Sequence, residues 1–204
     1  MLARFDDPAQ ANRLRTDMAE NMRKRGGPTK LLITEGAERN RTLAEVAVSN
    51  KTDPITAAIA VIRVGDPGVI SFNQSEADII AFMRQPWVMT DSDASPGHPR
   101  VYGSFARKYA KYVVADHVLT LREMIERSSS LTADTFGLTG RGHLKAGAFA
   151  DVVVFDPRRY APRATYQQPT ELAVGVQTVL VNGVLAVDGG KLTGRAAGGS
   201  LRHR

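Results

Sequence analysis

The chain has 204 residues, of which 43% are hydrophobic and 24% charged, with a formal net charge of +6. This composition allows one large or two small globular domains and excludes wholesale disorder and collagen-like repeats. Because there is no cysteine, disulfide frameworks and thiol nucleophiles are excluded. No apolar run reaches the ~20 residues of a membrane helix. The N-terminal stretch contains the charged residues Arg4, Asp6 and Asp7, whereas a signal peptide has an apolar stretch there. We therefore expect a soluble, cytoplasmic protein with no membrane partner.

The basic residues are concentrated in segment 13–25 and in the tail 202–204. A face that binds nucleic acid would combine such charges with aromatic residues for base stacking. Segment 13–25 instead contains the acids Asp17 and Glu20 and no aromatic residue. This pattern favours a solvated helix face, so we expect no nucleic-acid partner.

The first half of the chain alternates helix and strand patterns. Asp7 before Pro8 is a typical helix start, and Thr42 with Glu45 fits a capping box. The predicted helices cover residues 7–25, 42–50, 53–64 and 75–84, and the predicted strands cover residues 31–34, 68–72 and 86–93. Alternation of this kind favours parallel βα units.

Beyond the polar turn at 94–99 the pattern changes from helical to β. Helices are predicted around 105–114, at 121–128 and at 132–136, followed by strands at 150–156, 176–181 and 184–187. The last two strands are joined by Asn182-Gly183, a strong hairpin signal. The fold class is therefore α/β over residues 1–139, followed by a small antiparallel β unit over residues 140–204.

Two side chains near the end of the predicted strand 86–93 could carry chemistry. Asp93 ends this strand, and ligands gather at the carboxyl ends of parallel strands, where a carboxylate acts as general base or holds a metal-bound water. Alternatively, Asp93 only caps the following turn. Arg100 suits recognition of a substrate carboxylate, or is an exposed loop arginine. His98 is a candidate ligand or base, or a loop residue.

The sequence contains no metal set of its own. Its four histidines, His98, His117, His143 and His203, are widely spaced and form no zinc-binding motif. A glycine-rich phosphate loop before a helix and a Gly-x-Ser-x-Gly elbow are also missing. From the residues alone, the chain offers one acid and one arginine.

A longer pattern around these residues resembles a known family. Residues 86–93, Pro-Trp-Val-Met-Thr-Asp-Ser-Asp, are followed by His98-Pro-Arg-x-Tyr-Gly-x-Phe-x-Arg107. Together they resemble the signature of the N-acyl-D-amino-acid deacylases (D-aminoacylases) of the metal-dependent amidohydrolase superfamily. Stretches 142–156 and 179–184 are similar to the small β domain of that superfamily. Segments 21–27, 42–47 and 70–76 also fit, so the resemblance covers nearly the whole chain.

The resemblance implies a fold and a reaction. Residues 1–139 would be the C-terminal part of a (β/α)₈ TIM-like barrel, and residues 140–204 a small, sandwich-type β segment. The reaction would be hydrolysis of the linear amide of an N-acyl-D-amino acid. Asp93 falls at the family's strand-eight aspartate, which takes a proton from the metal-bound water and passes it to the leaving amine. Arg100 matches the arginine that holds the substrate α-carboxylate.

The sequence also departs from the family pattern. The family has glycine after Ser-Asp, whereas this chain has Ala94, which strains the loop if that position needs a positive φ. Family members hold zinc through an early His-x-His, a cysteine and further histidines, but here no histidine precedes His98. A (β/α)₈ barrel takes ~250 residues. We therefore expect this chain alone to bind no catalytic zinc and to show no turnover.

Three alternatives to an active deacylase remain open, the first two because of these departures and the third because of the basic charge. The chain could be a catalytically inactive remnant, or a split-enzyme subunit whose complementing N-terminal half supplies the metal ligands. Unpaired strand edges predict self-association or marginal stability. The third alternative is a basic nucleic-acid binder, which salt-dependent DNA binding would support.

Overall fold

The structure is a computed structural model that describes residues 2–93 and 97–201. These residues form two compact units. The first contains the described residues up to Ser75 together with Gly97 and His98. The second contains Glu76 to Asp93 and the described residues from Pro99 onwards. This division is a finding about packing, and the boundary expected at residues 139 and 140 stays a prediction.

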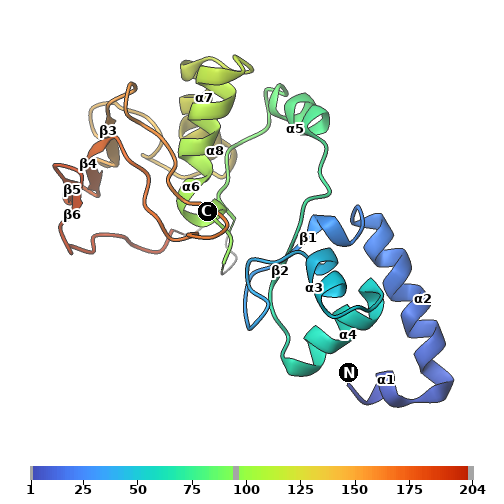
Figure 1. The fold of residues 1–204 in the computed structure, drawn as a ribbon. Coiled ribbons are helices and arrows are strands. Elements are labelled where there is room, and N and C mark those ends of the chain that lie inside the picture. Colours follow the sequence, from blue (N-terminus) through green and yellow to red (C-terminus); the bar gives the residue numbers. More distant parts are fainter. Residues whose placement is uncertain (1, 94–96, 202–204) are drawn as a thin grey trace. The chain divides into compact units, whose positions relative to one another are not determined.

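The first unit is mostly helical (Figure 1). Its elements are α1 (Ala3–Asp6), α2 (Pro8–Lys24), the 3₁₀ turn η1 (Pro28–Lys30), β1 (Leu31–Ile33), α3 (Leu43–Ser49), α4 (Pro54–Val64) and β2 (Val69–Ser71). The expected caps are confirmed: Asp7 accepts a hydrogen bond from the backbone N–H of Ala9 at 2.9 Å, and Thr42 and Glu45 form a capping box. Local side-chain chemistry therefore sets where these helices begin.

The core of the first unit lies where α2, α3 and α4 meet β1. Val46 is fully buried and Ile33 is 2% exposed. The other buried members of this cluster are Met22, Leu31, Leu43, Ala47 and Ala57. All three residues of β1 are buried, so the strand is covered on both faces.

The expectation of parallel βα units is wrong for β1 and β2. The two strands pair antiparallel, with Leu31 opposite Ser71 and Ile33 opposite Val69. The connection contains two helices, α3 and α4, separated by a short turn. This helical hairpin returns the chain from the end of β1 so that β2 runs back along it, whereas a parallel pair needs a crossover.

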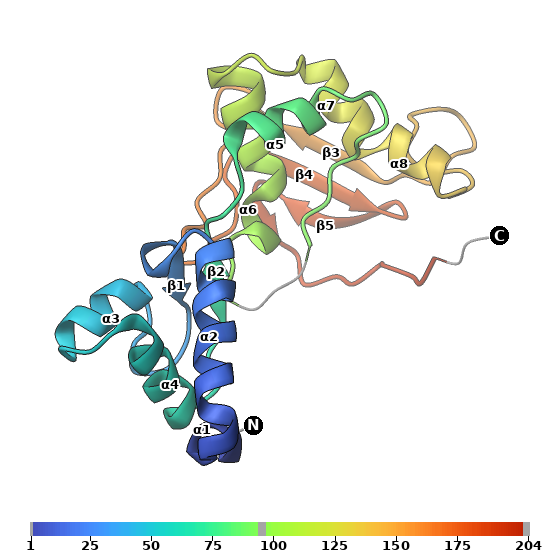
Figure 2. The same cartoon turned by 90° about the vertical axis from the view of Figure 1, so that its right-hand side faces the viewer.

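The second unit joins helices to a four-stranded sheet. Its helices are α5 (Glu76–Met83), α6 (Arg100–Arg107), the π-helix η2 (Lys108–Ala115), α7 (Leu121–Ser128) and α8 (Ser130–Thr135). Its strands are β3 (Val152–Phe155), β4 (Val176–Val181), β5 (Val184–Asp188) and β6 (Lys191–Leu192). The sheet is antiparallel with the order β3-β4-β5-β6, and Figure 2 shows β3, β4 and β5 side by side. The mixture of helices and strands fits the expected α/β class.

The predicted hairpin is confirmed in its detail. Asn182 and Gly183 have φ values of 50° and 80°, the left-handed pair that a two-residue type I′ turn requires. The carboxylate of Asp151 holds the turn: its Oδ1 accepts the backbone N–H of Asn182 at 2.8 Å, and its Oδ2 pairs with Arg141. The strand β6 was not predicted, because two residues carry too little pattern.

The expected helix at 105–114 forms as α6 and η2, which continue one another without a break. Aromatic side chains connect η2 to the sheet. The Tyr109 ring lies 6.0 Å from that of Phe155 on β3, and its hydroxyl donates to the carbonyl of Pro157 at 2.8 Å. Tyr160 completes the cluster, 4.9 Å from Phe155. This contact fixes η2 against β3.

The predicted strand 86–93 does not form among the described residues: this segment is a turn followed by irregular backbone and pairs with no strand. A strand is stable only when a neighbour completes its hydrogen-bond ladder. Here side chains and the carbonyl of Arg127 hold the segment instead. None of the helices described between residues 2 and 201 has the length and apolar character needed to cross a membrane.

Candidate functional site

The structure brings together the two residues that the sequence singled out. The Nη2 atom of Arg100 lies 2.8 Å from Oδ2 of Asp93. Arg100 begins α6, while Asp93 ends the irregular segment 88–93. The side chain of Asp93 is 60% exposed and that of Arg100 is 35% exposed. Both groups are therefore within reach of a ligand from solvent.

The backbone of Asp93 has a φ of 48°, in the left-handed region. Few residues other than glycine adopt it, and aspartate is among those that tolerate it best. This backbone conformation determines the direction in which the side chain of Asp93 points away from the backbone. Ala94, expected to strain the loop, lies outside the described residues, so its effect on Asp93 stays a prediction.

Thr90 anchors the segment that carries Asp93. Its backbone N–H donates to the carbonyl of Arg127 at 3.0 Å. Its hydroxyl accepts from Nζ of Lys108 at 2.6 Å, and Oγ of Ser128 lies 2.9 Å from the same oxygen. These contacts fix the segment to η2 and α7, three residues before the carboxylate.

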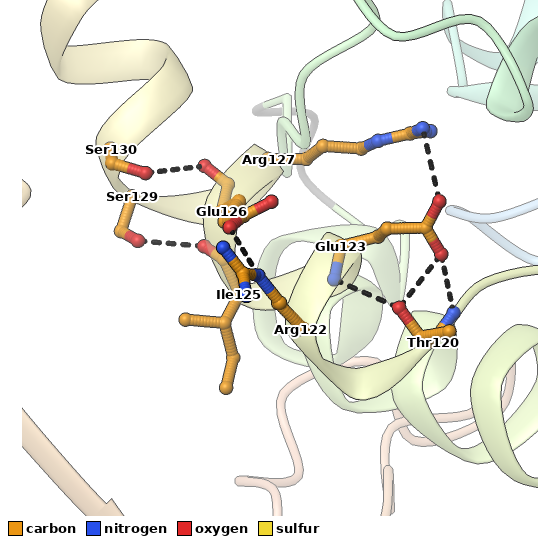
Figure 3. Close-up of polar contacts among 8 residues, drawn as sticks. All are labelled: Thr120, Arg122, Glu123, Ile125, Glu126, Arg127, Ser129 and Ser130. Carbon is orange, nitrogen blue, oxygen red and sulfur yellow. Dashed lines mark hydrogen bonds and ion pairs between the residues drawn. The ribbon is translucent and has the colours of Figure 1, made fainter.

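Two of these anchoring residues, Lys108 and Arg127, are buried cations, at 7% and 6% exposure. Burial, helped by repulsion from Arg127, lowers the pKa of Lys108 to about 8. Sequence reasoning missed both. The Nη2 atom of Arg127 lies 4.0 Å from Oε1 of Glu123. Figure 3 shows this ion pair together with the capping box of Thr120 and Glu123. In the sequence, Glu123 and Arg127 are four residues apart, as ion pairs on a solvated helix face are. The sequence therefore does not show that Arg127 is buried.

The remaining motif residues have mixed environments. Gly103 is buried in α6, and a Cβ there would lie 3.4 Å from that of Ala164, so this glycine allows close packing. Tyr102 is 43% exposed, and Arg107 is exposed as well.

The histidines that the structure describes do not converge on a metal site. His117 Nδ1 lies 3.2 Å from the carbonyl of Val113, and His143 Nε2 lies 2.9 Å from Oδ1 of Asp134. His98 belongs to the first unit, and His203 lies outside the described residues. Across residues 2–93 and 97–201, no group of three or more histidines and acids is arranged to hold a metal ion. The described residues thus do not fit a zinc site by themselves.

Comparison with known proteins gives a consistent set of relatives. The profile of the amidohydrolase family matches residues 9–187. An N-acyl-D-glutamate deacylase of Alcaligenes xylosoxydans xylosoxydans is 39% identical over 147 residues, which is 70% of this chain and 30% of that protein. The chain therefore spans less than a third of the length of this relative.

Two solved structures extend the likeness to the fold. The N-acyl-D-glutamate deacylase of Bordetella bronchiseptica, complexed with zinc and a phosphonate mimic of the tetrahedral intermediate, has a TM-score of 0.70 and 36% identity. The match covers 78% of this chain and 36% of that one. A D-aminoacylase described by its binuclear metal centre has a TM-score of 0.72 and 32% identity, covering 81% of this chain and 36% of the other. The Bordetella structure contains zinc and the D-aminoacylase has a binuclear metal centre, which confirms the expectation that members of this family bind a metal such as zinc.

Proposed function

Because the chain belongs to the amidohydrolase family, and within it to the D-aminoacylase branch, we propose that it contributes Asp93 and Arg100 to the hydrolysis of N-acyl-D-amino acids. Water adds to the acyl carbon, the amide C–N bond breaks, and a carboxylate and a free D-amino acid leave. Asp93 accepts a proton from the attacking water and gives it to the leaving amine. Arg100 binds the α-carboxylate.

The observation that carries this proposal is the 2.8 Å approach of Arg100 to Asp93. In the substrate, the leaving nitrogen and the α-carboxylate are attached to the same carbon atom. A group that protonates the nitrogen and a group that holds the carboxylate must therefore lie close together, as these two side chains do. A guanidinium has five N–H donors, so Arg100 has donors for the carboxylate of the substrate. When the substrate replaces Asp93 as the partner of Arg100, the carboxylate of Asp93 is released to accept a proton from the water.

The metal ligands of the relatives require a separate source. We propose that residues outside this chain supply those ligands, since the described residues contain no group arranged as a metal site. We propose that residues 1–139 correspond to the C-terminal part of a (β/α)₈ barrel and residues 140–204 to its small β segment. A complementing N-terminal half would bring the metal.

A chimera tests this proposal. The corresponding segment of the Alcaligenes N-acyl-D-glutamate deacylase is replaced by this chain, and zinc-dependent hydrolysis of N-acetyl-D-glutamate is measured. We expect Asp93→Asn to lower kcat at least about 100-fold, the usual contribution of a positioned acid–base group. Asp188→Asn, an exposed aspartate at the end of β5, is the matched control and should leave kcat unchanged. Equal activity of the two variants would refute the role of Asp93.

A further inference from the structure

We propose that a pocket of the second unit, separate from the Asp93–Arg100 pair, binds a carboxylate with an apolar chain, and that Lys108 receives its head group. The inference does not rest on the proposed function, since it uses other residues and another ligand. It follows from a cavity, a buried cation and the charges around that cation.

The pocket has a volume of about 380 Å³ and lies among α5, residues 88–91, α6 and η2. This volume is within the range of small-molecule sites, roughly 300–1,000 Å³. Its apolar wall includes Ile79, Phe82 and Met83 of α5 and Val88. Phe82 is 63% exposed, which leaves a large apolar side chain uncovered at the rim. Such a wall suits a hydrocarbon chain.

Lys108 and its acceptor Thr90 both line this pocket. An ammonium group carries three donors, and the 2.6 Å bond to Thr90 Oγ1 uses one of them. The charge acting on Lys108 is that of Arg127, which repels it. The ion pairs formed by the described residues near it, such as Lys111 with Asp116 and Arg127 with Glu123, leave Lys108 without a carboxylate.

A buried cation that is repelled by a second one is costly unless an anion compensates it. A ligand carboxylate would accept the remaining donors of Lys108 and reduce its repulsion with Arg127. Two exposed lining residues, Asp91 and Arg107, carry opposite charges that largely offset each other. The lining residue Tyr112 interacts with Glu76, whose charge is paired with Lys111. The buried end of the pocket therefore selects an anion over a neutral or cationic head group.

The full chain titrated with octanoate tests the inference, because Trp87, its single tryptophan, directly precedes the pocket residue Val88 and reports binding by fluorescence. Octanol is the matched neutral probe, with the same chain length and no charge. We expect saturable binding of octanoate that is at least tenfold tighter than binding of octanol. Equal affinities, or no saturable binding, would overturn the proposal.

Variants of Lys108 separate the charge from packing. Lys108→Met should reduce octanoate affinity to that of octanol, whereas Lys108→Arg should preserve the preference. Because Lys108 loses its charge near pH 8, octanoate affinity of the wild type should fall between pH 7 and 9.5, and that of Lys108→Arg should not. If Lys108→Met fails to fold, the pH comparison decides, and an equal fall in both proteins would contradict the role of Lys108.

Discussion

The guanidinium of Arg100 lies 2.8 Å from the carboxylate of Asp93, so the two groups proposed to act on one substrate form an ion pair with each other. A substrate carboxylate must compete with Asp93 for Arg100. Since both side chains are partly exposed, water weakens this pair, and exposed pairs of this kind are worth only about 0–1 kcal/mol. The pair therefore orients Arg100 without preventing substrate binding.

The role of Arg100 predicts an effect on binding more than on chemistry. In the chimera, Arg100→Lys should raise KM for N-acetyl-D-glutamate about tenfold or more with a smaller change in kcat, because lysine cannot bind a carboxylate through two parallel hydrogen bonds. Steady-state kinetics measure this, with Arg158→Gln, an exposed arginine, as the control. A kcat defect at unchanged KM would instead place Arg100 in the chemical step.

The cap of α4 predicts a pH dependence of stability. Hydrogen bonds from Thr56, with smaller contributions from Ile55 and Arg15, lower the pKa of Asp53 from 3.8 to about 2. Because the folded pKa lies below the unfolded one, this stabilisation is present above pH 4 and disappears as the pH falls toward 2. Asp53→Asn keeps a capping side chain but removes the charge.

Urea denaturation between pH 2 and 6 measures this effect. The stability difference between wild type and Asp53→Asn should shrink as the pH falls from 4 to 2. Asp17→Asn, at an exposed position of α2, is the control for removing a negative charge. A difference that stays constant over this range would argue against a charge effect at Asp53.

Gly175 is a position where the backbone leaves no space for a side chain. Its φ is 86°, and a Cβ there would lie 2.6 Å from Cα of Tyr160. Gly175→Ala should lower the free energy of unfolding by at least about 2 kcal/mol, from left-handed strain and overpacking combined. Gly198→Ala, where no atom lies within 4 Å of the added Cβ, should change it little. Equal unfolding midpoints for the two variants would show that the turn at 156–160 adapts freely.

The capping box of α7 gives a smaller, local prediction. Thr120 accepts the backbone N–H of Glu123 at 3.2 Å, and the Glu123 carboxylate accepts that of Thr120 at 2.7 Å (Figure 3). Thr120→Ala should cost about 1 kcal/mol of stability, and Thr120→Ser should restore most of it. Chemical denaturation followed by circular dichroism measures both. A serine variant as unstable as the alanine variant would mean that the methyl group, not the cap, matters.

The features that were predicted correctly from the sequence are the helix caps and the hairpin turn, whose conformation depends on interactions between residues close together in the chain. Asp7, the Thr42–Glu45 box and the Asn182-Gly183 turn each act on neighbouring backbone groups. Asp93 and Arg100 lie seven positions apart, and the resemblance to the D-aminoacylases pointed to both. The structure pairs their side chains at 2.8 Å, while their roles in a reaction stay a prediction.

The features that were missed depend on distant partners. The segment 86–93 has the composition of a strand, but nothing in its sequence states whether a neighbouring strand is available. The direction of β2 relative to β1 depends on how α3 and α4 pack. Lys108 on η2 and Arg127 on α7 are buried where these helices contact Thr90. No local sequence pattern predicts this contact.

The central claim is that this chain provides the acid and the arginine of a deacylase site and depends on other residues for the metal. The most direct measurement is zinc-dependent hydrolysis of N-acetyl-D-glutamate by the purified chain, alone and mixed with the complementing N-terminal part of the Alcaligenes deacylase. We predict no turnover by either component alone and turnover by the mixture, which Asp93→Asn lowers at least about 100-fold. Zinc-dependent turnover by the chain alone, or a mixture whose activity Asp93→Asn leaves unchanged, would contradict the account.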